Sequence, residues 1–223
     1  METVLMTRQS REFDLKLAEI FVREGYRVFT ITSGADADAT AKNGITALPD
    51  DLAQAAAIIE KDAGKLDIYV ELSDERNGAD TFTVRDGLDE KVIRSLYEEN
   101  VLRPMATLEA FINLLDAGAR KRLCFIASAE ASINEARGTD GYGYKMGKAA
   151  MSNFYQMISN KLTPSGYTFR VFDPSLSEVS SEASAESAFT YFTRRRGTEG
   201  ENPLRDDEAR LVFRDAFARE HAW

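Results

Sequence analysis

The sequence has very little cysteine and histidine. Among its 223 residues there is one cysteine, Cys124, and one histidine, His221. A single cysteine excludes an internal disulfide, and the two residues together are too few for a zinc site with cysteine and histidine ligands. A Ser-His-Asp triad would have to use His221, which lies close to the last residue. We therefore expect neither a bound metal nor a triad hydrolase.

Long apolar runs and an excess of basic residues are also absent. The chain carries 37 acidic and 28 basic residues, which gives a formal net charge of −9. Nucleic acids and anionic membrane surfaces attract basic proteins, so neither is expected as a partner. No segment resembles a signal peptide or a membrane span, and with one cysteine this predicts a cytoplasmic protein.

Short β-rich runs alternate with helical segments along the whole chain. This order is typical of a parallel sheet covered by helices on both faces. No linker or repeat divides the chain, and 43% apolar residues suffice for one sizeable core, so residues 1–223 are expected to form a single domain. The expected strands are 4–6, 27–32, 45–47, 67–70, 122–126, 169–172 and 211–214. The expected helices are 13–24, 52–61, 89–115, 144–162 and 183–196, with a short turn near Asp206.

Tyr144 and Lys148 stand four residues apart at the start of an expected helix. Side chains at this spacing lie on the same helical face. A lysine ammonium beside a phenol favours the phenolate, and this predicts a lowered pKa for Tyr144. A tyrosine with such a pKa can exchange a proton with a carbonyl or alcohol oxygen near neutral pH.

Two further polar residues give this pair a context. Ser128 follows the apolar run 123–127, where it would lie at the tip of a strand, and Asn100 lies inside the long helical segment 89–115. With these residues the chain resembles the short-chain dehydrogenases/reductases, and most of all the C-factor-like group. The ending F-R-D-A-F-A-R-E-H-A-W is similar to that of the group, so the resemblance covers essentially the whole chain. It implies a Rossmann-like, doubly wound, mostly parallel seven-stranded sheet.

The resemblance also implies a role for each residue of the site. Tyr144 would be the catalytic acid or base, and Lys148 would lower its pKa. Ser128 would bond the substrate oxygen, and Asn100 would hold a water that links Lys148 to solvent. Ser132 competes with Ser128 for its role, but Ser128 keeps the spacing of the group.

The expected cofactor loop departs from the pattern of the family. The family has T-G-x-x-x-G-x-G after the first strand, where glycines let the backbone approach the dinucleotide pyrophosphate. Here Arg8, Glu12 and Asp14 fill the three glycine positions. The remaining candidates for cofactor contact in this loop are Thr7, Arg8 and Arg11. The two arginines would favour NADP over NAD as the cofactor.

Two more cofactor contacts of the family are replaced in this chain. Its N-N-A-G after the fourth strand is Glu71-Leu72-Ser73-Asp74 here. Its P-G-x-V-x-T after the sixth strand aligns with the segment 174–179, so that Val179 stands at the position of the threonine. The proton-transfer residues are therefore kept while three separate cofactor contacts are lost.

Three functions follow as hypotheses. The first is an NAD(P)-dependent carbonyl or alcohol oxidoreductase acting on a small molecule, with impaired or atypical dinucleotide binding. The second is a cofactor-free, non-catalytic homologue that binds or oligomerises. The third is a cofactor-independent lyase or dehalogenase-type enzyme on the same scaffold. In each case the resemblance implies a homodimer or homotetramer formed through the helices 89–115 and 144–162.

Overall fold

The structure is a computed structural model, and it describes residues 1–7, 11–32, 44–175, 178–194, 207 and 210–223. Seven strands form one sheet in the order β3-β2-β1-β4-β5-β6-β7. Every pair of neighbouring strands is parallel. The strands are β1 (Thr3–Met6), β2 (Arg27–Ile31), β3 (Thr46–Leu48), β4 (Ile68–Glu71), β5 (Arg122–Ile126), β6 (Thr168–Asp173) and β7 (Phe213–Asp215). The predicted Rossmann-like class is confirmed, and the sheet is wholly rather than mostly parallel.

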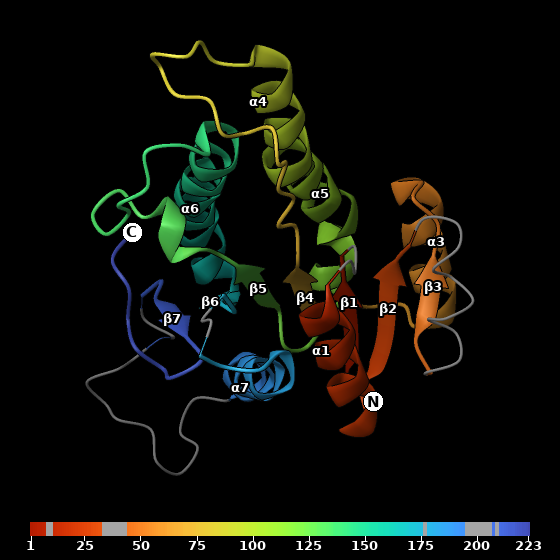
Figure 1. Cartoon of the computed structure of the whole chain (residues 1–223). Coiled ribbons are helices and arrows are strands. Elements are labelled where there is room, and N and C mark those ends of the chain that lie inside the picture. Colours follow the sequence, from red (N-terminus) through yellow and green to blue (C-terminus); the bar gives the residue numbers. More distant parts are fainter. Residues whose placement is uncertain (8–10, 33–43, 176–177, 195–206, 208–209) are drawn as a thin grey trace.

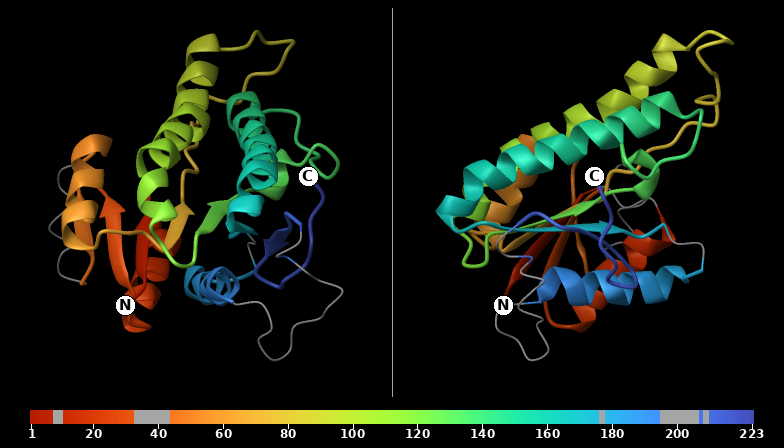
Figure 2. Two further views of the ribbon diagram at one scale, coloured as in Figure 1. Left: turned by 180° about the vertical axis from the view of Figure 1, so that it is seen from behind. Right: turned by 90° about the vertical axis from the view of Figure 1, so that its left-hand side faces the viewer.

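Helices cover both faces of this sheet (Figures 1 and 2). One face is covered by α1 (Glu12–Arg23) and α7 (Ser181–Thr193), and the other by α3 (Leu52–Asp62), α5 (Arg103–Asp116) and α6 (Tyr142–Leu162). Short helical turns follow β5 (η3, Ala129–Ala131) and α6 (η4, Thr163–Ser165). These bounds lie within a few residues of the expected ones. Residues 195–196 and the turn expected near Asp206 lie outside the described residues.

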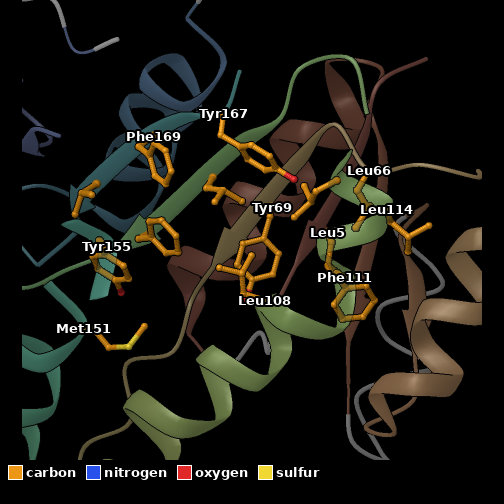
Figure 3. Packing of buried hydrophobic residues seen from close by; sticks show 14 of the residues in the cluster. Leu5, Leu66, Tyr69, Leu108, Phe111, Leu114, Met151, Tyr155, Tyr167 and Phe169 are labelled. Carbon is orange, nitrogen blue, oxygen red and sulfur yellow. The ribbon is translucent and has the colours of Figure 1, made fainter. Parts of the chain in front are cut away.

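The core has two halves because successive strand residues face opposite sides of the sheet. Leu5 and Tyr69 pack with Phe111 and Tyr155 under α5 and α6 (Figure 3). Residues on the other side of the same strands, such as Val70, pack under α1 and α7. A central parallel strand is buried on both faces, and this explains the continuous apolar runs in the sequence.

The long helix expected over residues 89–115 contains a π-helical turn. It consists of α4 (Glu90–Tyr97), a π-helical turn η2 (Glu98–Leu102) and α5. Asn100 lies in the π-helical turn, and its side-chain amide donates to the carbonyl of Leu96 one turn earlier. Single π-turns inside helices often mark functional sites. The helical segment expected over residues 89–115 is therefore present, and the π-helical turn within it is the feature that the sequence did not predict. No helix among the described residues is long and apolar enough to cross a membrane.

Candidate active site at the carboxyl ends of the strands

The first turn of α6 carries Tyr144, and the next turn carries Lys148. Both side chains are buried, with residue exposures of 4% and 3%. A carboxylate from the loop after β4 holds the start of this helix, because Asp80 accepts hydrogen bonds from the backbone N–H groups of Gly143 and Tyr144 at 3.1 and 2.9 Å. A helix otherwise leaves its first N–H groups without partners. Asp80 therefore helps to fix the position of Tyr144.

Ser128 lies just beyond β5 and next to Tyr144. Its hydroxyl acts to lower the pKa of the Tyr144 phenol. The competing candidate, Ser132, uses its hydroxyl to accept from the backbone N–H groups of Asn134 and Glu135. Of the two serines, Ser128 has the position that the spacing in the sequence predicts.

Asn100 joins the π-helical turn to the loop after β4. Its side-chain oxygen accepts from the N–H of Glu75 at 2.9 Å, and its amide nitrogen donates to the carbonyl of Glu75 at 2.8 Å. The structure thus brings all four predicted residues to one place, and there Asn100 holds the backbone of the adjacent loop. Their catalytic roles stay predictions.

Asp74 also belongs to this site, although the sequence did not lead us to expect its contact with Tyr144 and Lys148. One oxygen of its carboxylate accepts from the Tyr144 hydroxyl at 2.6 Å and lies 3.6 Å from the Lys148 ammonium. The other oxygen lies 2.5 Å from the guanidinium of Arg11. The sequence contains a signal for it, since Asp74 stands in the altered N-N-A-G segment, but that segment by itself indicates only a lost cofactor contact.

The environment of Tyr144 reverses the expected direction of its pKa. Burial raises the pKa of the phenol, and the carboxylate of Asp74 raises it further. Ser128 and the charge of Arg76 act in the other direction without reversing the shift. The predicted lowering by Lys148 is therefore not found, because burial disfavours the phenolate and the carboxylate of Asp74 accepts a hydrogen bond from the phenol.

Lys148 is committed to partners other than Tyr144. Its ammonium donates to the backbone carbonyls of Ser73 and Ile126, both at 2.8 Å. Burial lowers its pKa below the ordinary value; Asp74 opposes this shift and Arg11 adds to it. For Asp74, burial alone would raise the pKa, but the charges of Lys148 and Arg11 outweigh it, so the pKa is lowered. The surroundings of Asp74 thus favour its ionised form.

Arg76 covers the tyrosine on the solvent side. Its guanidinium donates to the Tyr144 hydroxyl at 2.9 Å and lies 4.0 Å from the centre of the ring. It also pairs with Glu130, and both of these side chains are about half exposed. Exposed ion pairs of this kind contribute only about 0.2–1 kcal/mol to stability. This outer cover is therefore weak compared with the buried contacts of Asp74.

Carboxylates also occupy the predicted cofactor loop. Arg11 is the N-cap residue of α1, and its own N–H donates to the carboxylate of Asp14 at 2.9 Å. The guanidinium of Arg11 pairs with Asp14 at 2.8 Å as well as with Asp74. Asp14 is fully buried. The helix terminus that binds phosphate in many nucleotide-binding proteins is here occupied by internal carboxylates.

Thr7 points into the protein and not toward a ligand. It is buried, its hydroxyl donates to the carboxylate of Glu71 at 2.8 Å, and it accepts from the N–H of Leu72 at 2.8 Å. Glu12 accepts from the hydroxyl of Ser181 at the start of α7. Arg8, the third candidate for cofactor contact, lies outside the described residues.

These contacts do not fit a dinucleotide cofactor. Within the described residues, the two cations at the inner end of the site, Arg11 and Lys148, already pair with Asp14 and Asp74. A pyrophosphate placed about 4 Å from one such carboxylate would meet a repulsion of about 4 kcal/mol at an effective dielectric constant near 20. The carboxylates of Asp14 and Asp74 therefore already pair with the positive charges that the phosphates of a dinucleotide would otherwise contact.

The fold is shared with known oxidoreductases. The carbonyl reductase Sniffer of Drosophila melanogaster has a TM-score of 0.80 and 16% identity, with all of both chains covered. A carbonyl reductase from Pseudomonas aeruginosa PAO1 in complex with NADP has a TM-score of 0.71 and 20% identity, again with full coverage. A short-chain type dehydrogenase/reductase from Mycobacterium ulcerans has a TM-score of 0.72 and 19% identity, covering 86% of this chain and 83% of that one.

The similarity is visible in structure and not in sequence. No protein-family model matches the chain, and no curated protein sequence matches it. Assignment to the C-factor-like group stays a prediction. With seven parallel strands in the doubly wound order and full-length overlap with these structures, the chain has the fold of the short-chain dehydrogenases/reductases.

Proposed function

We propose that this protein uses the short-chain dehydrogenase/reductase fold without a dinucleotide, as a non-redox binding protein that associates with itself. The observation that carries the proposal is the position of Asp74, whose carboxylate contacts Tyr144, Lys148 and Arg11. Hydride transfer needs a nicotinamide. Among the described residues, Arg11 and Lys148 are paired with internal carboxylates and are not available to bind the phosphates of a dinucleotide.

The state of Tyr144 also supports this proposal. A general acid or base works best when its pKa lies near the working pH. The pKa of Tyr144 is raised above its ordinary value by burial and by Asp74, and the phenol donates a hydrogen bond to that carboxylate. In this arrangement the phenol contributes a hydrogen bond to the packing of the loop, and proton exchange with a substrate is suppressed.

Self-association is supported by apolar side chains that remain exposed on the helices named for it. Leu102 and Met105 on the 89–115 segment are 45% and 38% exposed, and Met146 and Met157 on α6 are 50% and 62% exposed. The two segments lie side by side on the same face of the sheet (Figure 2). Methionine and other large apolar side chains are common in the cores of protein interfaces. We propose a homodimer or homotetramer built on these helices.

The second candidate is an NAD(P)-dependent carbonyl or alcohol oxidoreductase. One observation favours it, namely that Ser128, Tyr144, Lys148 and Asn100 lie together at the carboxyl ends of β4 and β5. In that function Tyr144 would exchange a proton with the substrate oxygen and Ser128 would bond the same oxygen. For this function the carboxylate of Asp74 would have to move away from both Tyr144 and Lys148.

A calorimetric titration with NADPH and then NADH separates the two candidates. We expect no heat of binding and no change in the melting temperature of this protein. The carbonyl reductase of Pseudomonas aeruginosa, whose structure contains NADP, is the positive control. Binding with a Kd below about 100 μM, or about −5.5 kcal/mol, would contradict the proposal and support the oxidoreductase.

A further inference from the structure

We infer that Arg11, Tyr144 and Lys148 form a binding site for a carboxylate group, and that this chain fills the site with its own Asp74. Donors from α6 and from the N-terminus of α1 converge on one carboxylate. The phenol and the ammonium contact one oxygen at 2.6 and 3.6 Å, and the guanidinium contacts the other at 2.5 Å. Two cations and a hydroxyl donor make a strong set of partners for a single carboxylate.

The donors are held in place by contacts that do not involve Asp74. Arg11 also pairs with Asp14 and donates to the carbonyl of Leu72 at 3.2 Å. Lys148 also donates to two backbone carbonyls. Tyr144 sits on the helix turn that Asp80 caps. All three donors would therefore keep their positions if the carboxylate of Asp74 were removed.

The backbone on both sides of Asp74 is held as well. The carbonyl of Ser73 accepts from Lys148, and the N–H and carbonyl of Glu75 both bond to the side chain of Asn100. The side chain of Asp74 is only 12% exposed. Truncation to alanine would therefore leave a hole of carboxylate size, lined by donors, in a loop that cannot easily collapse into it.

The ligand class follows from the size and charge of this hole. Replacing aspartate by alanine removes one carboxylate group, and formate is the smallest molecule that restores it. Acetate adds one methyl group, and pivalate adds a bulky one. We propose that the emptied site binds small monocarboxylates. This inference goes beyond the proposed function and does not depend on it.

The test uses the full chain carrying Asp74→Ala, with its melting temperature measured in sodium formate, acetate, pivalate or chloride at equal ionic strength. We expect formate and acetate to raise the melting temperature above the value in chloride, by about 3–6 °C at about ten times the Kd. Pivalate should behave as chloride does. In Asp74→Asn the side-chain amide fills the hole, so formate should not differ from chloride. Asp74→Ala/Tyr144→Phe lacks one donor and should need more formate for the same shift.

A melting temperature of Asp74→Ala that is the same in formate and in chloride would overturn the inference. If this variant does not fold in chloride, the folded fraction at low temperature is compared in the two salts by circular dichroism, and equal fractions would overturn it equally. Binding of NADPH by the unaltered protein would contradict the proposed function and leave the response to formate unaffected. The two proposals therefore fail separately.

Discussion

Thr7 follows the last residue of β1, Thr30 lies on the neighbouring strand β2 opposite Met6, and both threonines are buried. The hydroxyl of Thr7 joins the carboxylate of Glu71 to the N–H of Leu72. The hydroxyl of Thr30 has no hydrogen-bond partner among the described residues. The two buried hydroxyls therefore have opposite effects on the stability of the fold, because a buried polar group stabilises it only when it has a hydrogen-bond partner.

Valine substitutions at these two threonines form a matched pair. Thr7→Val keeps the side-chain shape but leaves the N–H of Leu72 without its partner, so we expect a loss of about 1–3 kcal/mol in the free energy of unfolding. Thr30→Val removes an unpaired hydroxyl and should leave stability unchanged or raise it by up to about 1 kcal/mol. Urea unfolding of the two variants measures both values. Equal losses in both would show that the Thr7 hydroxyl is not the bridge described here.

The residues of the site show how far sequence reasoning reaches. Tyr144 and Lys148 could be paired from their spacing, because an α-helix puts residues four apart on one face. Asp74 could not be placed in this way, since it is 70 residues from Tyr144 in the sequence. It reaches the tyrosine only because the strand order puts β4 beside β5 and its loop beside α6. The predicted lowering of the Tyr144 pKa is wrong because burial and this carboxylate both raise it.

At the scale of elements, two glycines of α6 differ in how closely α4 and η2 approach them. A Cβ atom at Gly143 would lie 2.8 Å from a side-chain carbon of Leu96 and 3.1 Å from the backbone of Ile93. A Cβ atom at Gly147 would have no neighbour closer than 3.6 Å. Gly143 thus permits the close approach of α4 to α6, whereas Gly147 is an ordinary helix position.

Alanine at these glycines tests the approach of the two helices. Gly143→Ala should lower the free energy of unfolding by about 1–3 kcal/mol, because the backbone of α4 cannot move away cheaply. Gly147→Ala should raise it by about 0.5–1 kcal/mol, the usual gain of alanine over glycine inside a helix. Thermal or urea unfolding of the two variants measures whether each substitution lowers or raises the free energy of unfolding. A stable Gly143→Ala variant would contradict the close contact.

The elements themselves could largely be predicted. Alternating apolar runs and helical stripes placed the seven strands and most helix bounds within a few residues. The π-helical turn at residues 98–102 could not be predicted, because its residues suit an α-helix equally well. It depends on the side chain of Asn100 bonding the loop after β4, which is a tertiary contact.

At the scale of the whole molecule, the exposed apolar side chains of α5 and α6 predict self-association. Replacing Met105 and Met157 together by glutamate should weaken the assembly at least tenfold, because charge is depleted in the cores of interfaces. Leu15→Glu is the control, since Leu15 is 46% exposed on α1 at the opposite face. Sedimentation velocity over a concentration series measures the assembly. An unaltered protein that stays monomeric, or variants that assemble equally well, would contradict this interface.

The pairing of Lys148 and the raised pKa of Tyr144 both involve Asp74, which also pairs with Arg11. The most direct test of this account is the ionisation of the Tyr144 phenol, followed by the ultraviolet absorbance of phenolate as the pH rises. Subtracting the curve of Tyr144→Phe from that of the unaltered protein isolates this one tyrosine. The same subtraction is made in the background of Asp74→Asn.

We expect no phenolate from Tyr144 at or below the ordinary tyrosine pKa of about 10 in the unaltered protein, because burial and Asp74 raise its pKa. In Asp74→Asn the charges of Lys148, Arg11 and Arg76 remain near the phenol. Its pKa should then fall below its value in the unaltered protein. An unaltered protein in which Tyr144 ionises with a pKa below about 10 would contradict the account and restore Lys148 as the group that controls the tyrosine.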